Sequence, residues 1–424
     1  MTGPGSANSA SAVQSNFDKL RRIPWFYAST VLTATAVLCT VQAPMALFAA
    51  ELGLSEDRIG LLAGMMPFFQ ALGVLVLPII ARFGSRRVSA SVLALRYVFL
   101  GLFFVAPVFI ARPELAFGIL ALAMLGFAIC RSVAEAALVP WSQEFIPRSV
   151  RGRIAGRMAL AYLPVALAVS WATKTWLDGR DGLDRFYPVF AIGIVIGIVG
   201  ALCLFGLRGG AASVVRQRSY GNLAAPLRDR NFRLFLLASA LQNLVAVSIG
   251  VFLLLYFRDR AGMSSGVLVL MAAFIPVGAA LGTLLAGWFV DRYGTKPIQI
   301  GLLAGQIMLL LTLGLMGRAL GASEILTAMV FFLFGFMFQS GISVANVYML
   351  NVVPEAAKEG YTVLHYSVDG VIGGAATFAA GFLLSWIGGQ QLEVAGTVLG
   401  NFEVLFVLSA AVISVAAVCF SRLR

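Results

Sequence analysis

The chain has 424 residues, of which 60% are hydrophobic and only 12% are charged. A soluble globular protein is about 25% charged and roughly half apolar, so this composition excludes one. Apolar stretches of about 20 residues recur along the chain, and a helix of that length crosses roughly 30 Å of hydrocarbon. The composition therefore predicts an all-α membrane protein with many spans.

The formal net charge is +12, which by itself would also suit nucleic acid as a partner. The positions of the basic residues favour another explanation, because most of them fall in alternate loops between the apolar stretches. Such a bias is typical of the cytoplasmic loops of membrane proteins. We therefore expect both termini in the cytoplasm, an even number of spans and no nucleic-acid partner.

Residues 1–22 are rich in Ser, Gly and Ala, and we expect them to form a disordered cytoplasmic tail. Twelve spans follow, divided six and six by a basic segment at 208–231 that is expected to be a cytoplasmic connector. The predicted domains are an N-terminal bundle at 23–207 and a C-terminal bundle at 232–424. The predicted spans are 23–49, 57–80, 88–110, 114–139, 154–177, 187–207, 232–257, 266–289, 297–317, 323–349, 361–387 and 398–420.

Two short segments recur in the two bundles at nearly the same offset. The second span ends in ARFGSRR and the eighth ends in DRYGTKP. The fourth and tenth spans each end in a proline followed by a charged loop, at Pro147 and Pro354. Two matches at nearly one offset indicate duplication of a six-helix unit.

The loop between the second and third spans of each half carries a recognisable signature of glycine, an acid and basic residues. In the second half it consists of Gly287, Asp291, Arg292, Gly294 and Lys296. In the first half Leu77 and Ala81 replace the glycine and the acid, and the retained residues are Arg82, Gly84, Arg86 and Arg87. With twelve spans and the repeat, the chain resembles the major facilitator superfamily from about Ile23 to Phe420.

The resemblance implies two pseudo-symmetric six-helix bundles that transport a solute by alternating access. It also implies that the signature loops latch the cytoplasmic side shut between the halves, acid against basic residues. The expected gate residues are Asp291, Arg292, Gly294 and Lys296, with Arg82, Arg86 and Arg87, Arg148, Arg151 and Arg153, and Glu355 and Glu359. The alternative, that these charges only set the topology, stays open.

A few ionisable residues lie inside the predicted spans, where a charge costs at least about 2.5 kcal/mol unless it faces a cavity or a partner. Glu135 follows Arg131 on one helix face, and His365 precedes Asp369 in the same way. Arg131 can pair with Glu135 in its own helix or with Asp369 across the halves. Arg96 can pair with Glu135 from a neighbouring helix.

Only a pair across the halves would change as the halves move. A buried carboxylate near an arginine could exchange its proton for the cation, which predicts proton coupling through Asp369 or Glu135. His365 could pass protons to the cytoplasm, or be an ordinary hydrogen-bonded residue near a helix end. Two other interpretations of the group stay open: a fixed ion network that holds the helices, and recognition of a charged substrate.

By the resemblance, the first helix of each three-helix repeat lines a central cavity. These helices carry polar residues at three- and four-residue spacing, which turns polar groups to one face, although ordinary interhelical hydrogen bonds would give the same pattern. The candidate cavity residues are Thr35, Cys39, Gln42, Gln242, Asn243, Gln339, Ser343 and Asn346. Amides and hydroxyls with few charges suit a small neutral, amphipathic or singly charged organic solute.

The sequence shows no nucleotide-binding loop, metal motif or hydrolase motif, so we expect no enzyme activity, cofactor or metal site. It predicts a proton-coupled secondary transporter for a small-molecule substrate, acting as a monomer in the lipid bilayer of a bacterial inner membrane or its equivalent. The alternative is a transporter-like protein that does not transport and serves as a membrane assembly or binding factor. A continuous cavity lined by the polar residues would favour the transporter.

Overall fold

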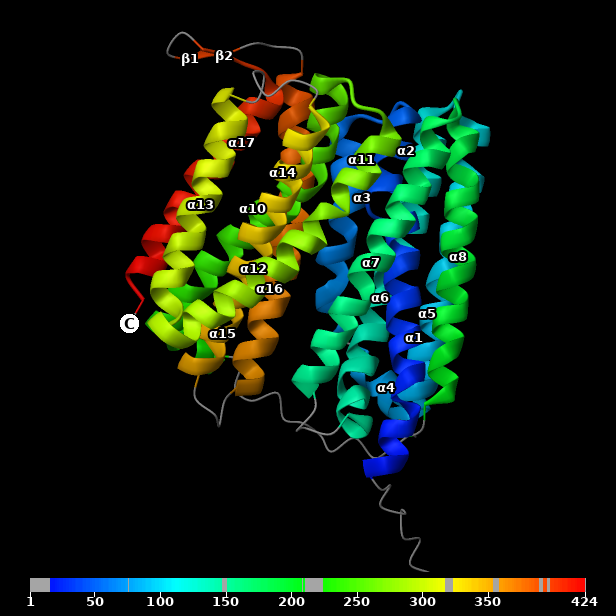
Figure 1. The fold of residues 1–424 in the computed structure, drawn as a ribbon, viewed down its shortest axis with the longest axis vertical. Coiled ribbons are helices and arrows are strands. Elements are labelled where there is room, and N and C mark those ends of the chain that lie inside the picture. The colour runs from blue at the N-terminus through cyan, green and yellow to red at the C-terminus, as the bar shows by residue number, and fades with distance from the viewer. Residues whose placement is uncertain are drawn as a thin grey trace, which may run out of the picture.

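The structure, a computed structural model, describes residues 16–74, 76–146, 151–207, 209, 224–316, 323–353, 358–388, 392–394 and 397–423. Its long helices run side by side in two groups, one from each half of the sequence (Figure 1). Within the described residues, ten helices are long and apolar enough to cross a membrane by length and composition. The expected all-helical architecture of two bundles is confirmed.

The first bundle contains six spans, several of them built from more than one helical segment. They are α1 (Asn16–Thr40) with α2 (Ala43–Glu51); α3 (Glu56–Phe68) with η1 (Phe69–Val74) and α4 (Leu77–Phe83); α5 (Ser85–Leu100) with η2 (Gly101–Phe104) and η3 (Ala106–Phe109); α6 (Pro113–Phe145); α7 (Arg151–Asp178); and η5 (Leu183–Arg185) with α8 (Phe186–Cys203) and η6 (Leu204–Gly206).

The second bundle follows a short helix, α9 (Ala224–Arg228), and repeats this order. Its spans are α10 (Arg230–Ala261); α11 (Ser265–Ala272) with α12 (Phe274–Tyr293); α13 (Thr295–Met316); α14 (Glu324–Phe334) with the π-helical η8 (Gly335–Gln339) and α15 (Ser340–Val352); α16 (Lys358–Ile387); and α17 (Asn401–Ser421). Two short strands, β1 (Leu392–Val394) and β2 (Thr397–Leu399), pair antiparallel before α17.

Local signals explain several helix ends. The Asp229 carboxylate accepts hydrogen bonds from the backbone N–H groups of Asn231 and Phe232, which caps α10. Gly84 and Gly294 have φ of 85° and 87° at the α4–α5 and α12–α13 turns, a backbone conformation that disfavours any residue with a Cβ. The glycines of the two signature loops are therefore explained by turn geometry.

Three expected boundaries need correction. Helix α1 begins at Asn16, so residues 16–22 of the expected disordered tail are helical, and Arg22 Nη1 donates to the Gly206 carbonyl at 3.0 Å. The connector 208–231 contains α9 and the start of α10. The expected last span, 398–420, begins instead at Asn401, because residues 397–399 pair as a strand.

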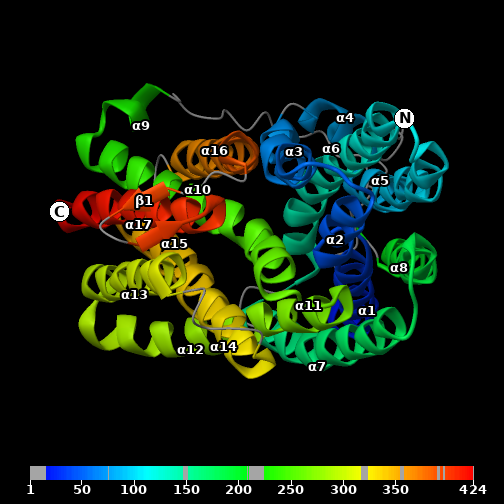
Figure 2. The ribbon, with the colours of Figure 1, turned by 90° about the horizontal axis from the view of Figure 1, so that it is seen from above.

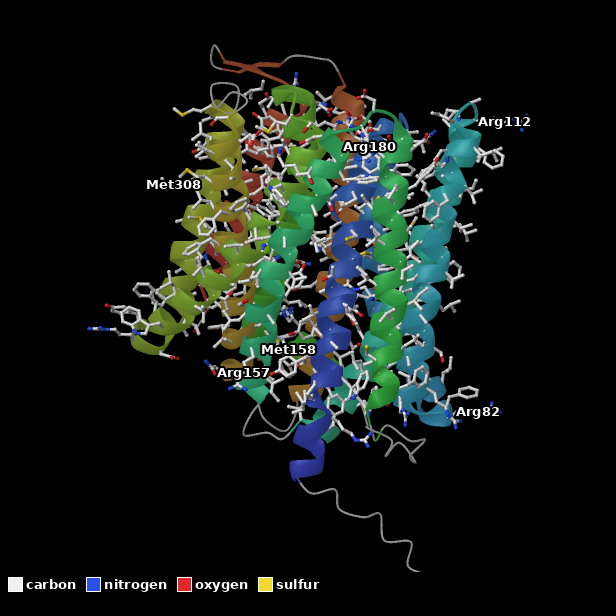
Figure 3. The ribbon with its side chains drawn as sticks, turned by 45° about the vertical axis from the view of Figure 1, so that its right-hand side comes forward. Arg82, Arg112, Arg157, Met158, Arg180 and Met308 are labelled. Atoms are coloured by element: carbon white, nitrogen blue, oxygen red, sulfur yellow. The ribbon has the colours of Figure 1, made fainter. Side chains whose placement is uncertain are left out.

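The two ends of the molecule differ in the loops that they hold. The end with the Gly84 and Gly294 turns, here the signature end, also holds Arg82 and Arg157, while Arg112 and Arg180 lie at the opposite end (Figure 3). The opposite end, here the far end, holds α2 and α11 (Figure 1). Lys296 Nζ donates to the Leu423 carbonyl at 2.6 Å, so the end of α17 also lies at the signature end.

Helices α3 and α16 join the two bundles in the closest helix contact between them (Figure 2). Added Cβ atoms on Gly64 and Gly374 would each lie 2.5 Å from the carbonyl oxygen of the other glycine. A Cβ on Gly60 would lie 2.6 Å from the Thr377 carbonyl oxygen. We name Gly60, Gly64, Gly370, Gly374 and Gly381 the glycine seam. At the seam the backbones approach so closely that side chains are excluded.

Replacing a seam glycine should therefore separate the two bundles or strain them. We expect Gly374→Ala to destabilise the folded protein by about 1–3 kcal/mol, as overpacking does in a tight core. The measurement is the melting temperature of the purified protein in detergent. The matched control is Gly301→Ala in α13, where an added Cβ meets nothing within 4 Å. Equal melting temperatures for the two variants would contradict the role of the seam.

Candidate functional site

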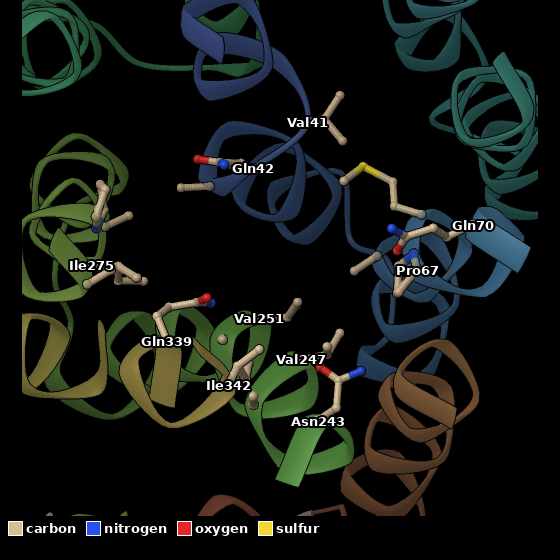
Figure 4. Close-up of a pocket in the computed structure, with 18 of the residues that line it drawn as sticks. Val41, Gln42, Pro67, Gln70, Asn243, Val247, Val251, Ile275, Gln339 and Ile342 are labelled. Carbon is tan, nitrogen blue, oxygen red and sulfur yellow. The ribbon is translucent and has the colours of Figure 1, made fainter. Parts of the chain in front are cut away.

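A cavity of about 730 Å³ lies between the two bundles and is lined by both. This volume is in the range of small-molecule sites, about 300–1,000 Å³. In Figure 4, Gln42, Gln70, Asn243 and Gln339 stand around the central space, with Ile275, Val247 and Val251 between them. The polar and charged lining residues are Gln42, Gln70, Arg131, Tyr162, Asn243, Gln339, Asn346, Tyr366 and Asp369.

Half of the candidate cavity residues line this space, namely Gln42, Asn243, Gln339 and Asn346. The other four do not line it. The hydroxyls of Thr35 and Ser343 donate to backbone carbonyls of their own helices, at 2.8 and 2.9 Å. Cys39 is buried, and Gln242 accepts a hydrogen bond of 2.9 Å from Gln299 within the C-terminal bundle. These residues follow the alternative pattern of ordinary contacts between and within helices.

Of the three possible pairings, the described residues form only the one within α6. Arg131 Nε lies 2.7 Å from Glu135 Oε1. Arg96 is 3% exposed, donates to the Tyr97 hydroxyl at 2.6 Å and lies over the Tyr97 and Phe127 rings. Among the described residues, neither Arg96 with Glu135 nor Arg131 with Asp369 forms an ion pair. An aromatic enclosure holds Arg96, and Arg131 and Asp369 line the cavity from different bundles.

Asp369 lies on α16 in a chain of polar side chains. Its Oδ2 accepts from the Ser239 hydroxyl at 3.1 Å and lies 3.6 Å from His365 Nδ1. His365 is 1% exposed, and its Nε2 lies 3.1 Å from Asn346 Oδ1. Asp369 Oδ1 is buried and has no hydrogen-bond partner in the part of the chain that is described. His365 thus joins the cavity residues Asp369 and Asn346 from behind the wall.

Hydrogen bonds between the halves close the far end of the cavity. Glu51 Oε1 on α2 accepts from Ser265 at the start of α11 at 2.5 Å and from Arg185 at 2.6 Å. Asp178 Oδ1 on α7 accepts from the Ser264 hydroxyl at 2.6 Å. The Ser385 hydroxyl on α16 donates to Asp57 at 3.0 Å. These contacts tie α2, α3 and α7 to the second bundle.

The expected gate residues at the signature end make contacts inside their own halves. Arg86 Nη2 donates to the Phe205 carbonyl at 2.7 Å, Arg82 lies over the Phe83 ring and Arg292 over the Trp288 ring. No ion pair joins Asp291 to another described residue. Arg148 and Glu355 lie outside the described residues, as do the side chains of Arg151, Arg153 and Glu359. The latch between the halves stays a prediction.

The sequence reasoning missed three polar lining residues, Gln70, Tyr162 and Tyr366. Helix α3 ends at Phe68, one residue after Pro67, and the Gln70 carbonyl in the following segment accepts from the Ser132 hydroxyl at 3.1 Å. For Gln70 the available signal was a proline three residues before a polar residue inside a span. Gln339 lies at the end of the π-helix η8, whose Met337 carbonyl accepts from Gln306 at 3.0 Å. Such π-helical turns frequently lie at functional sites.

Solved structures of several transporters share this fold. The nucleoside transporter NupG matches with a TM-score of 0.67 and 15% identity, covering 97% of this chain and 99% of that one. An occupied, inward-facing bacterial homologue of the human lysosomal transporter Spinster matches at 0.70 and 16%, covering 95% and 97%. A bacterial homologue of the iron transporter ferroportin matches at 0.70 in its inward-facing state, with 14% identity and coverage of 95% and 98%.

The outward-facing state of the same ferroportin homologue matches less well, with a TM-score of 0.57 at 17% identity and coverage of 95% and 99%. No curated protein sequence matches the chain. The family model of the Major Facilitator Superfamily matches residues 25–377, which is most of the chain. With its apolar helices and its two-bundle fold, this multi-pass membrane protein belongs to the major facilitator superfamily.

Proposed function

We propose that the protein is a secondary active transporter that carries a small neutral, amphipathic or singly charged organic solute by alternating access, coupled to protons. The cavity supports a carrier over a binding or assembly factor, because residues from both bundles line it and because, among the described residues, the hydrogen bonds between the halves lie at its far end. Its lining combines amides, two phenols and aliphatic side chains with few charges, which suits such a solute.

The observation that supports proton coupling is the position of Asp369 beside His365, one turn away on the same helix. When His365 Nε2 donates to Asn346, Nδ1 turns a lone pair toward Asp369 Oδ2, 3.6 Å away. Two acceptors that face each other repel, and one proton between them removes the repulsion. No described arginine or lysine lies within 4.0 Å of Asp369, so a proton is the available way to neutralise this buried carboxylate.

The closed end indicates which state the structure represents. The positive-inside prediction assigns the signature end to the cytoplasm, and the cross-half hydrogen bonds lie at the other end. The higher TM-score against the inward-facing ferroportin homologue supports the same assignment. We infer an inward-facing state in which Glu51, Asp178 and Ser385 form the outer gate.

Asp369→Asn should abolish solute movement driven by a pH gradient and spare solute counterflow, since asparagine keeps the shape of the side chain but cannot take up a proton. Both rates are measured in proteoliposomes, using a solute identified in a thermal-shift screen, because a ligand of the folded state raises its melting temperature. The matched control is Asp259→Asn, since Asp259 pairs with Arg258 at the end of α10 and outside the cavity. Normal gradient-driven uptake by Asp369→Asn would exclude Asp369 as the coupling site.

Loosening the outer gate should open the cavity toward the outside. Glu51→Gln weakens the acceptor shared by Ser265 and Arg185, so we expect faster labelling of a cysteine at Ala46 by a membrane-impermeant maleimide added from outside. The four native cysteines are first replaced by alanine. Glu114→Gln is the matched control, because Glu114 pairs with Arg58 inside one half. Equal labelling rates in both variants would argue against this gate.

A further inference from the structure

Arg131 presents unused hydrogen-bond donors to the cavity. Its Nε is taken by Glu135 at 2.7 Å, and its Nη1 lies 4.0 Å from the Met66 sulfur, a weak acceptor. Its Nη2 has no partner among the described residues, and the side chain is 32% exposed. The two Nη atoms form the planar fork that binds a carboxylate with two parallel hydrogen bonds. The cavity wall therefore offers a docking point for a carboxylate.

A second guanidinium adds positive charge behind this wall. Arg96 is buried among Tyr97 and Phe127, and it lies within electrostatic reach of both Arg131 and Glu135. Aromatic rings attract a cation but do not cancel its charge. At this depth the N-terminal bundle thus holds two described cations and one described carboxylate. The excess charge is positive and stands beside the cavity.

Asp369, which lines the cavity from the other bundle, completes the set of charges. When Asp369 is ionised and His365 is neutral, the two arginines balance the two carboxylates. When Asp369 carries a proton, one positive charge remains beside the cavity. An uncompensated charge is costly in a low-dielectric interior, so a cavity in this second state favours one bound negative charge before it closes.

We assign the exchange of a proton on this side of the cavity to Asp369, on the basis of the side chains that surround it. His365 and Tyr366 are the ionisable residues next to it on α16. The packed helix α10 brings Ser239 and Asn243 toward it, and the α3–η1 span brings Gln70 beside Gly370. Helix α17 meets α16 near Leu384, at the far end.

We propose that the substrate is an organic monocarboxylate that binds the Arg131 fork and crosses together with one proton on Asp369. The proposal rests on the proposed function and names its substrate class and stoichiometry. The empty carrier returns with Asp369 ionised, so the cavity crosses without net charge in both directions. The neutral part of the substrate meets Gln42, Gln70 and Gln339, whose side chains have no hydrogen bond to another described residue.

Matched acid and amide pairs test the substrate class. The purified full-length protein is screened by thermal shift at pH 5.5 with gluconate and gluconamide, mandelate and mandelamide, and nicotinate and nicotinamide. We expect acids to raise the melting temperature and their amides to have no effect, because only the acids supply a charge for the fork. If no acid raises the melting temperature, or if acids and amides do so equally, the proposal is overturned.

Variants at the fork then test the residue. Arg131→Lys keeps the charge and removes the planar fork, and the double variant Arg131→Gln with Glu135→Gln removes the ion pair without leaving an unpaired charge. We expect both to bind the tightest acid about ten-fold or more weakly. Arg258→Gln, outside the cavity, should bind it as the parent protein does. Unchanged affinity in the double variant would overturn the assignment of Arg131.

The stoichiometry has its own measurement. Proteoliposomes should take up the tightest acid when their interior is alkaline, above the passive rate of protein-free liposomes of the same lipid. A potassium diffusion potential should not change the initial rate, because an anion and a proton cross as a neutral pair. A two-fold or larger effect of the potential would overturn the one-to-one ratio.

The proposed function and the substrate class can fail separately. If a neutral or cationic solute is carried in a manner that depends on Asp369, the transporter function stands and the monocarboxylate is excluded. If a solute that binds the cavity shows neither uptake nor counterflow, the transporter function itself is excluded.

Discussion

The contact of α3 with α16 at the glycine seam determines how the rest of the molecule can work. Without Cβ atoms the two backbones touch, so the bundles stay together although a cavity of about 730 Å³ separates them elsewhere. Asp369 directly precedes Gly370, whose added Cβ would lie 2.7 Å from the Pro67 carbonyl oxygen. The carboxylate is thus attached to the helix that contacts the other bundle most closely, and any rearrangement at the seam moves it.

The two bundles hold different charged groups at the cavity: the Arg131 cation belongs to the first bundle and the Asp369 carboxylate to the second. Because Arg131 is paired with Glu135 on its own helix, Asp369 is not needed to balance it and remains available for a proton. In the proposed mechanism the cation and the proton site belong to different bundles, so a solute and a proton would influence the same closing movement through the total charge of the cavity.

Much of the fold follows from local physical rules that can be read in the sequence. Apolar length predicts the spans, and Gly84 and Gly294 predict the signature turns because only glycine adopts their φ without strain. The sequence does not show which of two neighbouring polar residues faces the cavity and which faces another helix. Asn243 lines the cavity while Gln242, one residue earlier, meets Gln299, since successive residues of a helix point about 100° apart.

The remaining features depend on tertiary contacts that no local pattern encodes. The enclosure of Arg96 needs Phe127 from a neighbouring helix, and the π-helix that precedes Ser340 is met by Gln306 from α13. The glycine seam is visible in sequence only as glycines in two distant spans, which ordinary helix packing in membranes also uses. Their role appears only when the facing carbonyl oxygens are located.

The chemistry of the closed end fits the proposed carrier, which must open this end again. Its links between the halves are single hydrogen bonds, such as that of Ser265 to Glu51, and one such bond contributes only about 0.5–3 kcal/mol. Two conformations that differ by a few kcal/mol are both populated, and the binding of one solute and one proton can shift the equilibrium over that range. In the proposed carrier, weak links at the far end and backbone contact at the seam would therefore let one end of the cavity open and the other close while the bundles stay in contact.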